Sequence, residues 1–145
     1  MNRTKRPMAG NLTTAIALLL LPLPFFAAGA PRLIEITATK DAKFKVAGQK
    51  DPVTTVKPGE VLRLKITAQK GPEFEKDGAV HSFTIKELKD QGWDLRLKEG
   101  VSEFVLVAPA KPGEYLIECT VKCDPKHHDD MKAKLIVQGS SPATN

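Results

Sequence analysis

The chain has few of the features that mark whole classes of protein. It has 145 residues and only one long apolar run, near its N-terminus, which excludes a membrane protein with several spanning segments. This length leaves room for one domain of modest size and excludes a large multi-domain enzyme. The chain also shows no nucleophile paired with a base, no pair of carboxylates around a discernible cleft and no glycine-rich phosphate loop. We therefore do not expect an enzyme.

Residues 1–29 have the organisation of a secretory signal peptide. A basic start precedes an apolar run (15–28), which is short for a bilayer span and is interrupted by Pro22 and Pro24. Small residues follow, so we expect cleavage at or near Gly29. No cysteine stands at this junction, which excludes a lipoprotein anchor, and an uncleaved N-terminal anchor is the alternative. The mature protein is expected in the periplasm or otherwise secreted across the cytoplasmic membrane, without stable membrane insertion.

Little net charge remains once this segment is set aside. The whole chain has 22 basic and 17 acidic residues, and three of the basic ones (Arg3, Lys5 and Arg6) precede the apolar run. The other 19 basic and 17 acidic residues give the mature chain a net charge of +2. A surface of such mixed sign gives no reason to expect a nucleic-acid partner.

The rest of the chain alternates short β-rich runs with turns that contain glycine and proline. Residues 85–92 have the composition of a short helix. About seven short strands in this length indicate an all-β, Greek-key β-sandwich. We expect one domain at 30–139, followed by a disordered tail at 140–145. The clearest strand candidates are 33–39, 61–67, 81–85, 104–108, 115–121 and 133–137.

Residue types that bind metals are concentrated near the C-terminus. Within thirteen residues lie Cys119, Cys123, His127, His128 and Met131, which include both cysteines of the protein. Thiolate, imidazole and thioether groups are ligands that copper prefers over harder oxygen ligands. The cluster therefore indicates a copper site.

A third histidine, His81, opens a different strand. Alternation along the strand at 115–121 puts Tyr115, Ile117 and Cys119 on one face, so Cys119 is expected to end this strand pointing inward. In a sandwich the strand of His81 can lie beside the strand that ends at Cys119. His81 is therefore a further candidate ligand.

The arrangement of these residues resembles the cupredoxin superfamily. The shared features are a strand that begins with His81, a Pro-Gly-x-Tyr corner, and Cys, His and Met on one loop before the last strand. The chain is most similar to the domain that holds the binuclear copper centre, CuA, in cytochrome c oxidase subunit II and nitrous oxide reductase. The resemblance implies these metal ligands: His81, Cys119, the backbone carbonyl of Val121, Cys123, His127 or His128, and Met131.

The loop departs from the family pattern by one additional residue. His127 keeps the family's spacing from Cys123, whereas His128 keeps its spacing to Met131. The glycine that usually follows the second cysteine is replaced by Asp124. Either histidine can be the ligand, and the register of the last strand favours His128.

The resemblance implies an exported protein that carries single electrons to or from a redox partner such as a cytochrome or a terminal oxidase or reductase. The second cysteine favours a binuclear copper site, since a mononuclear site needs only one cysteine. Two alternatives stay open. One is a periplasmic copper chaperone or storage protein for oxidase assembly, which uses the same ligands. The other is a metal-free binding module stapled by a disulfide between Cys119 and Cys123, as is common in exported proteins.

Overall fold

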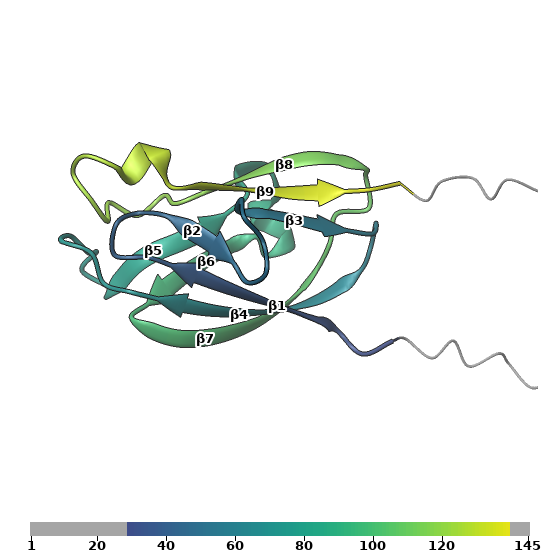
Figure 1. Ribbon diagram of the computed structural model, residues 1–145, viewed down its shortest axis with the longest axis horizontal. Coiled ribbons are helices and arrows are strands. Elements are labelled where there is room, and N and C mark those ends of the chain that lie inside the picture. Colours follow the sequence, from purple (N-terminus) through teal and green to yellow (C-terminus); the bar gives the residue numbers. More distant parts are fainter. Residues whose placement is uncertain (1–28, 140–145) are drawn as a thin grey trace, which may run out of the picture.

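The computed structural model describes residues 29–139, which form two stacked β-sheets (Figure 1). The strand order is β2-β1-β4-β7 in the four-stranded sheet and β3-β9-β8-β5-β6 in the five-stranded sheet. The signal peptide expected at 1–29 lies, apart from Gly29, outside the described residues, and so does the tail expected at 140–145. The elements are β1 (Arg32–Ala38), β2 (Phe44–Val46), β3 (Val53–Val56), β4 (Val61–Ala68), β5 (Ala79–Thr84), the 3₁₀-helix η1 (Lys86–Gln91), β6 (Asp94–Lys98), β7 (Gly100–Val107), β8 (Gly113–Glu118), the 3₁₀-helix η2 (His128–Asp130) and β9 (Lys132–Val137).

The structure confirms the expected all-β sandwich. Each of the six expected strand ranges overlaps one strand, namely β1, β4, β5, β7, β8 or β9. The chain crosses between the sheets after β2, β3, β4, β6 and β7, as in Greek-key sandwiches. The short helix expected at 85–92 is η1, which ends where Gly92 adopts a φ of 90°. Glycine takes this left-handed conformation without a Cβ penalty.

Three strands were not among the expected ranges, and the expected number of about seven was too low. The described part of the chain has nine strands. β2 and β3 have only 3 and 4 residues, which is too short for a period of two to be recognised. β6 was recognisable, because Leu95 and Leu97 alternate with polar residues and both are buried. No helix among residues 29–139 is long and apolar enough to cross a membrane.

The core is continuous and joins the two sheets along their length. Phe44 in β2 and Phe83 in β5 come from different sheets, and their rings meet edge to face at a centroid distance of 5.2 Å. The indole N–H of the buried Trp93 donates a hydrogen bond of 3.2 Å to the carbonyl of Val107. Contacts that join the two sheets thus also lie among residues that are not candidate ligands.

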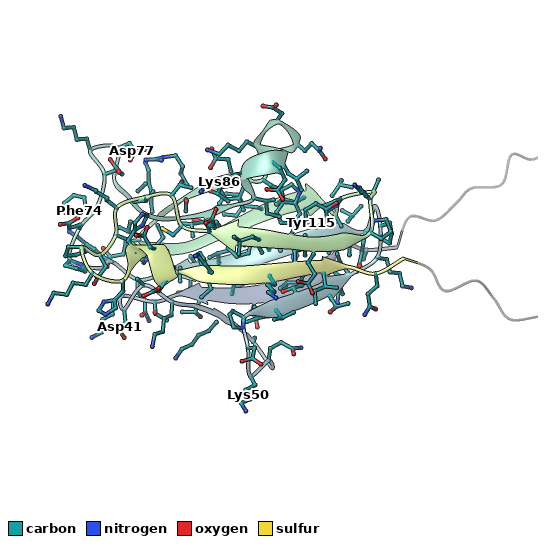
Figure 2. All side chains as sticks on the ribbon, turned by 90° about the horizontal axis from the view of Figure 1, so that it is seen from above. Asp41, Lys50, Phe74, Asp77, Lys86 and Tyr115 are labelled. Carbon is teal, nitrogen blue, oxygen red and sulfur yellow. The ribbon has the colours of Figure 1, made fainter. Side chains whose placement is uncertain are left out.

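Several connections meet at one end of the sandwich. The segments that follow β1, β4 and β8 lie there together with η2, whereas β1 begins and β9 ends at the opposite end (Figure 1). Figure 2 places Asp41 and Phe74, which belong to the segments after β1 and β4, at the η2 end. The candidate ligands between Cys119 and Met131 are therefore carried by a loop at one end of a stiff frame, and His81 lies in β5.

Candidate metal centre

The strands β5 and β8 bring His81 and Cys119 together. They pair antiparallel through Thr84 and Glu118, and the backbone N–H of Ser82 donates to Sγ of Cys119 at 3.4 Å. Cys119 is buried, as the strand alternation predicted. The expectation that the strand of His81 lies beside the one that leads to Cys119 is confirmed.

Five of the candidate ligands form a compact group. The potential ligand atoms of His81, Cys119 and Cys123 all lie within 4.8 Å of one another. The two Sγ atoms are 3.7 Å apart, and Sδ of Met131 is 3.9 Å from Sγ of Cys123. The carbonyl oxygen of Val121 lies 3.3 Å from Sγ of Cys119. All five residues are buried, with exposed fractions of 0 to 5%.

The two thiols are free and influence each other's pKa. The hydrogen bond with Cys123 lowers the pKa of Cys119, and the Ser82 N–H lowers it further. The same hydrogen bond and burial raise the pKa of Cys123. A metal that binds both sulfurs must therefore displace a proton that the pair holds firmly, so metal affinity is expected to fall as the pH falls.

A backbone carbonyl determines which nitrogen of the His81 ring carries the proton. Nε2 of His81 lies 2.8 Å from the carbonyl oxygen of Gln69. Because a carbonyl only accepts hydrogen bonds, Nε2 is the protonated nitrogen and Nδ1 has a free lone pair. A ring fixed in this way by a carbonyl on its far nitrogen is typical of histidines that bind metals.

Two buried nitrogen atoms lack a hydrogen-bond partner among residues 29–139. They are Nδ1 of His81 and Nδ1 of His128, and no other buried side-chain nitrogen or oxygen in this range is in the same situation. An unpaired buried polar atom costs free energy, and each such atom needs an explanation. A neutral imidazole nitrogen with a free lone pair is a common metal ligand.

The consecutive histidines have different surroundings. Oδ1 of Asp124 accepts hydrogen bonds from the backbone N–H groups of Lys126 (2.7 Å) and His127 (2.8 Å), and it lies 3.2 Å from Nδ1 of His127. This turn takes up the additional residue of the loop and leaves the His127 side chain 60% exposed. The His128 side chain is only 26% exposed. Neither histidine belongs to the group of three within 4.8 Å.

The donor set fits copper. Two cysteine sulfurs, a thioether and an imidazole with a free lone pair are soft or borderline ligands, which suit copper and zinc rather than magnesium or calcium. A surface hollow of about 260 Å³ beside the group is lined by His128. Larger hollows along β2 and beside η1 are lined by none of the candidate ligands.

Three residues that support the group give little or no signal in the sequence. Ser82 lies within an expected strand, and only the structure shows that its hydroxyl oxygen accepts a hydrogen bond of 2.7 Å from the N–H of Thr120. Asp124 was noted only as a replaced glycine, and the Asp-Pro pair was the available signal for the turn it makes. Gln69 acts through its backbone carbonyl, so its residue type gives no signal.

No protein-family model matches the chain, and no curated protein matches it either. Solved structures with a similar fold include one chain of a heme-copper terminal oxidase dimer, with 19% identity, a TM-score of 0.54, and coverage of 86% of this chain and 78% of that one. Rusticyanin is similar at 15% identity and a TM-score of 0.51, over 73% of this chain and 76% of its own. A multicopper oxidase that functions in iron import matches at 15% identity and a TM-score of 0.51, over 79% of this chain and 24% of its own. These likenesses show that the chain has the cupredoxin fold.

Proposed function

We propose that this protein binds copper at the η2 end of the sandwich and carries single electrons between redox partners. The observation that carries the proposal is the buried group of imidazole and sulfur ligands on a stiff β-frame. Copper, when bound, supplies a one-electron change between Cu(I) and Cu(II). The chain supplies ligand positions that stay the same in both oxidation states, which keeps the barrier to electron transfer low. The proposed ligands are His81, Cys119, the carbonyl of Val121, Cys123, His128 and Met131.

The positions of the sulfur atoms support a binuclear site. Two thiolates can bridge two metal ions only if both sulfurs face the same space, and the Sγ atoms of Cys119 and Cys123 do so at 3.7 Å. A mononuclear site needs only one of these cysteines. The carbonyl of Val121 faces Cys119 and agrees with a binuclear ligand set.

The unpaired Nδ1 of His128 supports the choice of His128 over His127. His127 faces solvent, and its Nδ1 lies beside the carboxylate of Asp124. His128 instead has a buried Nδ1 that finds no partner in the described part of the chain. Because His128 is not in the group of three, this assignment requires η2 to rearrange when the metal binds.

We further propose that residues 1–29 direct export and that the mature domain spans 30–139.

The partner is a redox protein, such as a cytochrome or a terminal oxidase or reductase, and the similarity to a chain of a heme-copper terminal oxidase supports this choice. We also propose that the domain is not a catalyst, since the proposed ligands would fill the positions that a substrate would need at the metal.

The sulfur-rich ligand set favours a second candidate function, which is copper delivery or storage. Three sulfur ligands suit Cu(I), and His128 lies at a hollow that is open to solvent. A delivery protein would release Cu(I) readily to a chelator and would show no reversible redox couple. An electron carrier would retain its copper and cycle reversibly.

Electron paramagnetic resonance with metal analysis tests the proposal, on mature domain whose thiols are reduced before copper is added and whose bound copper is then oxidised to the paramagnetic state. For a binuclear site, we expect a hyperfine pattern from two equivalent copper nuclei. Each of the single variants Cys119→Ser and Cys123→Ser should abolish this pattern. A pattern from one copper that survives Cys123→Ser would assign a mononuclear site. Met131→Leu should mainly shift the redox potential, because an axial thioether binds weakly. Copper binding equal to wild type in all three variants would refute the assigned site.

A further inference from the structure

The connection after β4 contacts two proposed ligands that come from different parts of the fold. At the start of the segment Gln69–Glu73, the carbonyl of Gln69 accepts the hydrogen bond from Nε2 of His81 at 2.8 Å. At its end, the N–H of Glu73 donates to the carbonyl of Cys123 at 3.3 Å. One short segment is thus bonded both to β5 and to the loop after β8.

The segment is itself anchored to the four-stranded sheet. The N–H of Gln69 donates to the carbonyl of Ala38 at 2.8 Å, and its side-chain Oε1 accepts from the N–H of Lys40 at 3.3 Å. On the outer side, Nζ of Lys70 lies 4.0 Å from the centroid of the Phe74 ring, which projects at the surface (Figure 2). The start of the segment therefore cannot shift without breaking bonds to the end of β1.

Gly71, in the middle of the segment, lies where a side chain has no room. A Cβ atom at this position would be 2.7 Å from the carbonyl oxygen of Cys123 and 3.2 Å from that of Lys40. Both are backbone atoms, which cannot turn away as a flexible side chain can. Gly71 is not among the glycines with a positive φ, so close approach, and not backbone conformation, requires glycine here.

We propose that Gln69–Glu73 is a clamp that positions the metal site, and that Gly71 is the positioning residue on which it depends. The clamp holds the His81 ring with Nδ1 towards the sulfurs, and it holds the Cys123 backbone so that Sγ stays beside Cys119. The role of the clamp depends on the proposed copper function, but the contacts that form the clamp are present in the metal-free chain. It can therefore be tested without copper.

The test variant is Gly71→Ala, and the matched control is Gly78→Ala in the same connection. A Cβ at Gly78 would meet nothing within 4 Å, but its φ of +84° makes alanine strained there. Both variants are expected to lose stability, since one is overpacked and the other is strained. Only Gly71→Ala should disturb the cysteines and His81.

The first readout uses the reduced, metal-free protein. Alkylation by iodoacetamide, assigned to each cysteine by mass spectrometry, should be at least about tenfold faster at Cys123 in Gly71→Ala than in wild type. The Nε2–H resonance of His81 should be visible in wild type and in Gly78→Ala and should be lost or broadened in Gly71→Ala. Equal alkylation rates and unchanged His81 resonances in the two variants would overturn the clamp.

A measurement on the wild type covers the case in which Gly71→Ala does not fold. The Glu73 amide donates to Cys123, whereas the described residues offer the Lys76 amide of the same connection no acceptor. Hydrogen exchange at Glu73 should therefore be at least about tenfold slower than at Lys76, after correction for intrinsic rates. Equal exchange at the two amides would refute the clamp.

The copper readout separates failure of the clamp from failure of the proposed function. If wild type binds copper, Gly71→Ala should bind it at least about tenfold more weakly and give a changed resonance spectrum, while Gly78→Ala should match wild type. If wild type binds no copper, the proposed function fails, but the alkylation and exchange results still decide on the clamp. Copper binding that is equal in wild type and Gly71→Ala would overturn the positioning role.

Discussion

At the scale of the residue, the histidines of the candidate site differ in whether Nδ1 of the ring has a polar partner. Nδ1 of His127 lies beside the carboxylate of Asp124 on an exposed side chain. Nδ1 of His81 and of His128 are buried and unpaired within the described range. Because an unpaired buried nitrogen is costly, a metal ion that accepted these two lone pairs would remove an energetic penalty as well as gain two ligands.

This difference predicts unequal effects of two alanine variants. His128→Ala should lower copper affinity by at least about tenfold, since a ligand bond is lost, whereas His127→Ala should change it less than about twofold. Competition with a chromophoric Cu(I) chelator measures both affinities. The two variants are matched controls for each other, because they lie side by side in one loop. A larger loss in His127→Ala than in His128→Ala would reverse the assignment.

At the scale of the element, β5 and β8 separate where the site begins. Their ladder has a single assigned pair, Thr84 with Glu118. Beyond this pair, the Ser82 hydroxyl oxygen takes the N–H of Thr120 at 2.7 Å, where a regular ladder would use a backbone carbonyl. The Ser82 N–H is then free to donate to Sγ of Cys119 at 3.4 Å. The Ser82 side chain thus takes the place of a backbone acceptor in the ladder, and the Ser82 backbone N–H can bond to the sulfur of Cys119.

Ser82→Ala is expected to destabilise the fold. The variant leaves the N–H of Thr120 without its hydrogen-bond acceptor at a partly buried junction, which costs about 0.5–1.5 kcal/mol in the free energy of unfolding. Urea denaturation of the metal-free protein measures this cost. Ser102→Ala, on β7 and partly exposed, is the control and should change the free energy by less than about 0.5 kcal/mol. An equal effect in the two variants would show that the Ser82 hydroxyl does not hold this junction.

At the scale of the whole molecule, the core extends well beyond the site. The buried cluster runs from β1 to β9, and besides Cys119, Val121, Cys123 and Met131 it includes Trp93 and the contact of Phe44 with Phe83, none of which is a candidate ligand. Such a core holds the fold without metal, unlike a small domain that folds only around its ion. The sandwich is therefore expected to keep its ligand positions when the metal is absent.

Metal removal should thus lower stability without unfolding the protein. At free copper of about one hundred times Kd, binding to the native state adds about 2.7 kcal/mol to the free energy of unfolding. After chelation the melting temperature should fall while the far-ultraviolet circular dichroism spectrum at 25 °C stays the same. Loss of the β-sheet spectrum on chelation would mean that the metal is part of the fold. No change in melting temperature would argue against binding at the buried site.

Local patterns in the sequence were enough to predict the sandwich and the types of ligand. The alternation of Leu62, Leu64 and Ile66 in β4 reports a strand with one buried face, because burial selects apolar side chains at a period of two. The spacing of Cys119 and Cys123 likewise predicts a metal-binding loop, and the structure brings their sulfur atoms within 3.7 Å of each other. Strands of three or four residues were missed because so few positions cannot show a period.

Only the tertiary structure decided which of the two loop histidines is the more buried and which backbone atoms support the site. The sequence left His127 and His128 open, and the turn at Asp124 distinguishes their surroundings. The carbonyl of Gln69 and the space at Gly71 left no mark in the sequence, because every residue has a carbonyl and a turn also explains a glycine. The residue type at a position indicates its local preferences, such as burial, strand formation or metal binding. The contacts that position a ligand join segments that are distant in the chain, and they form only when the sheets pack.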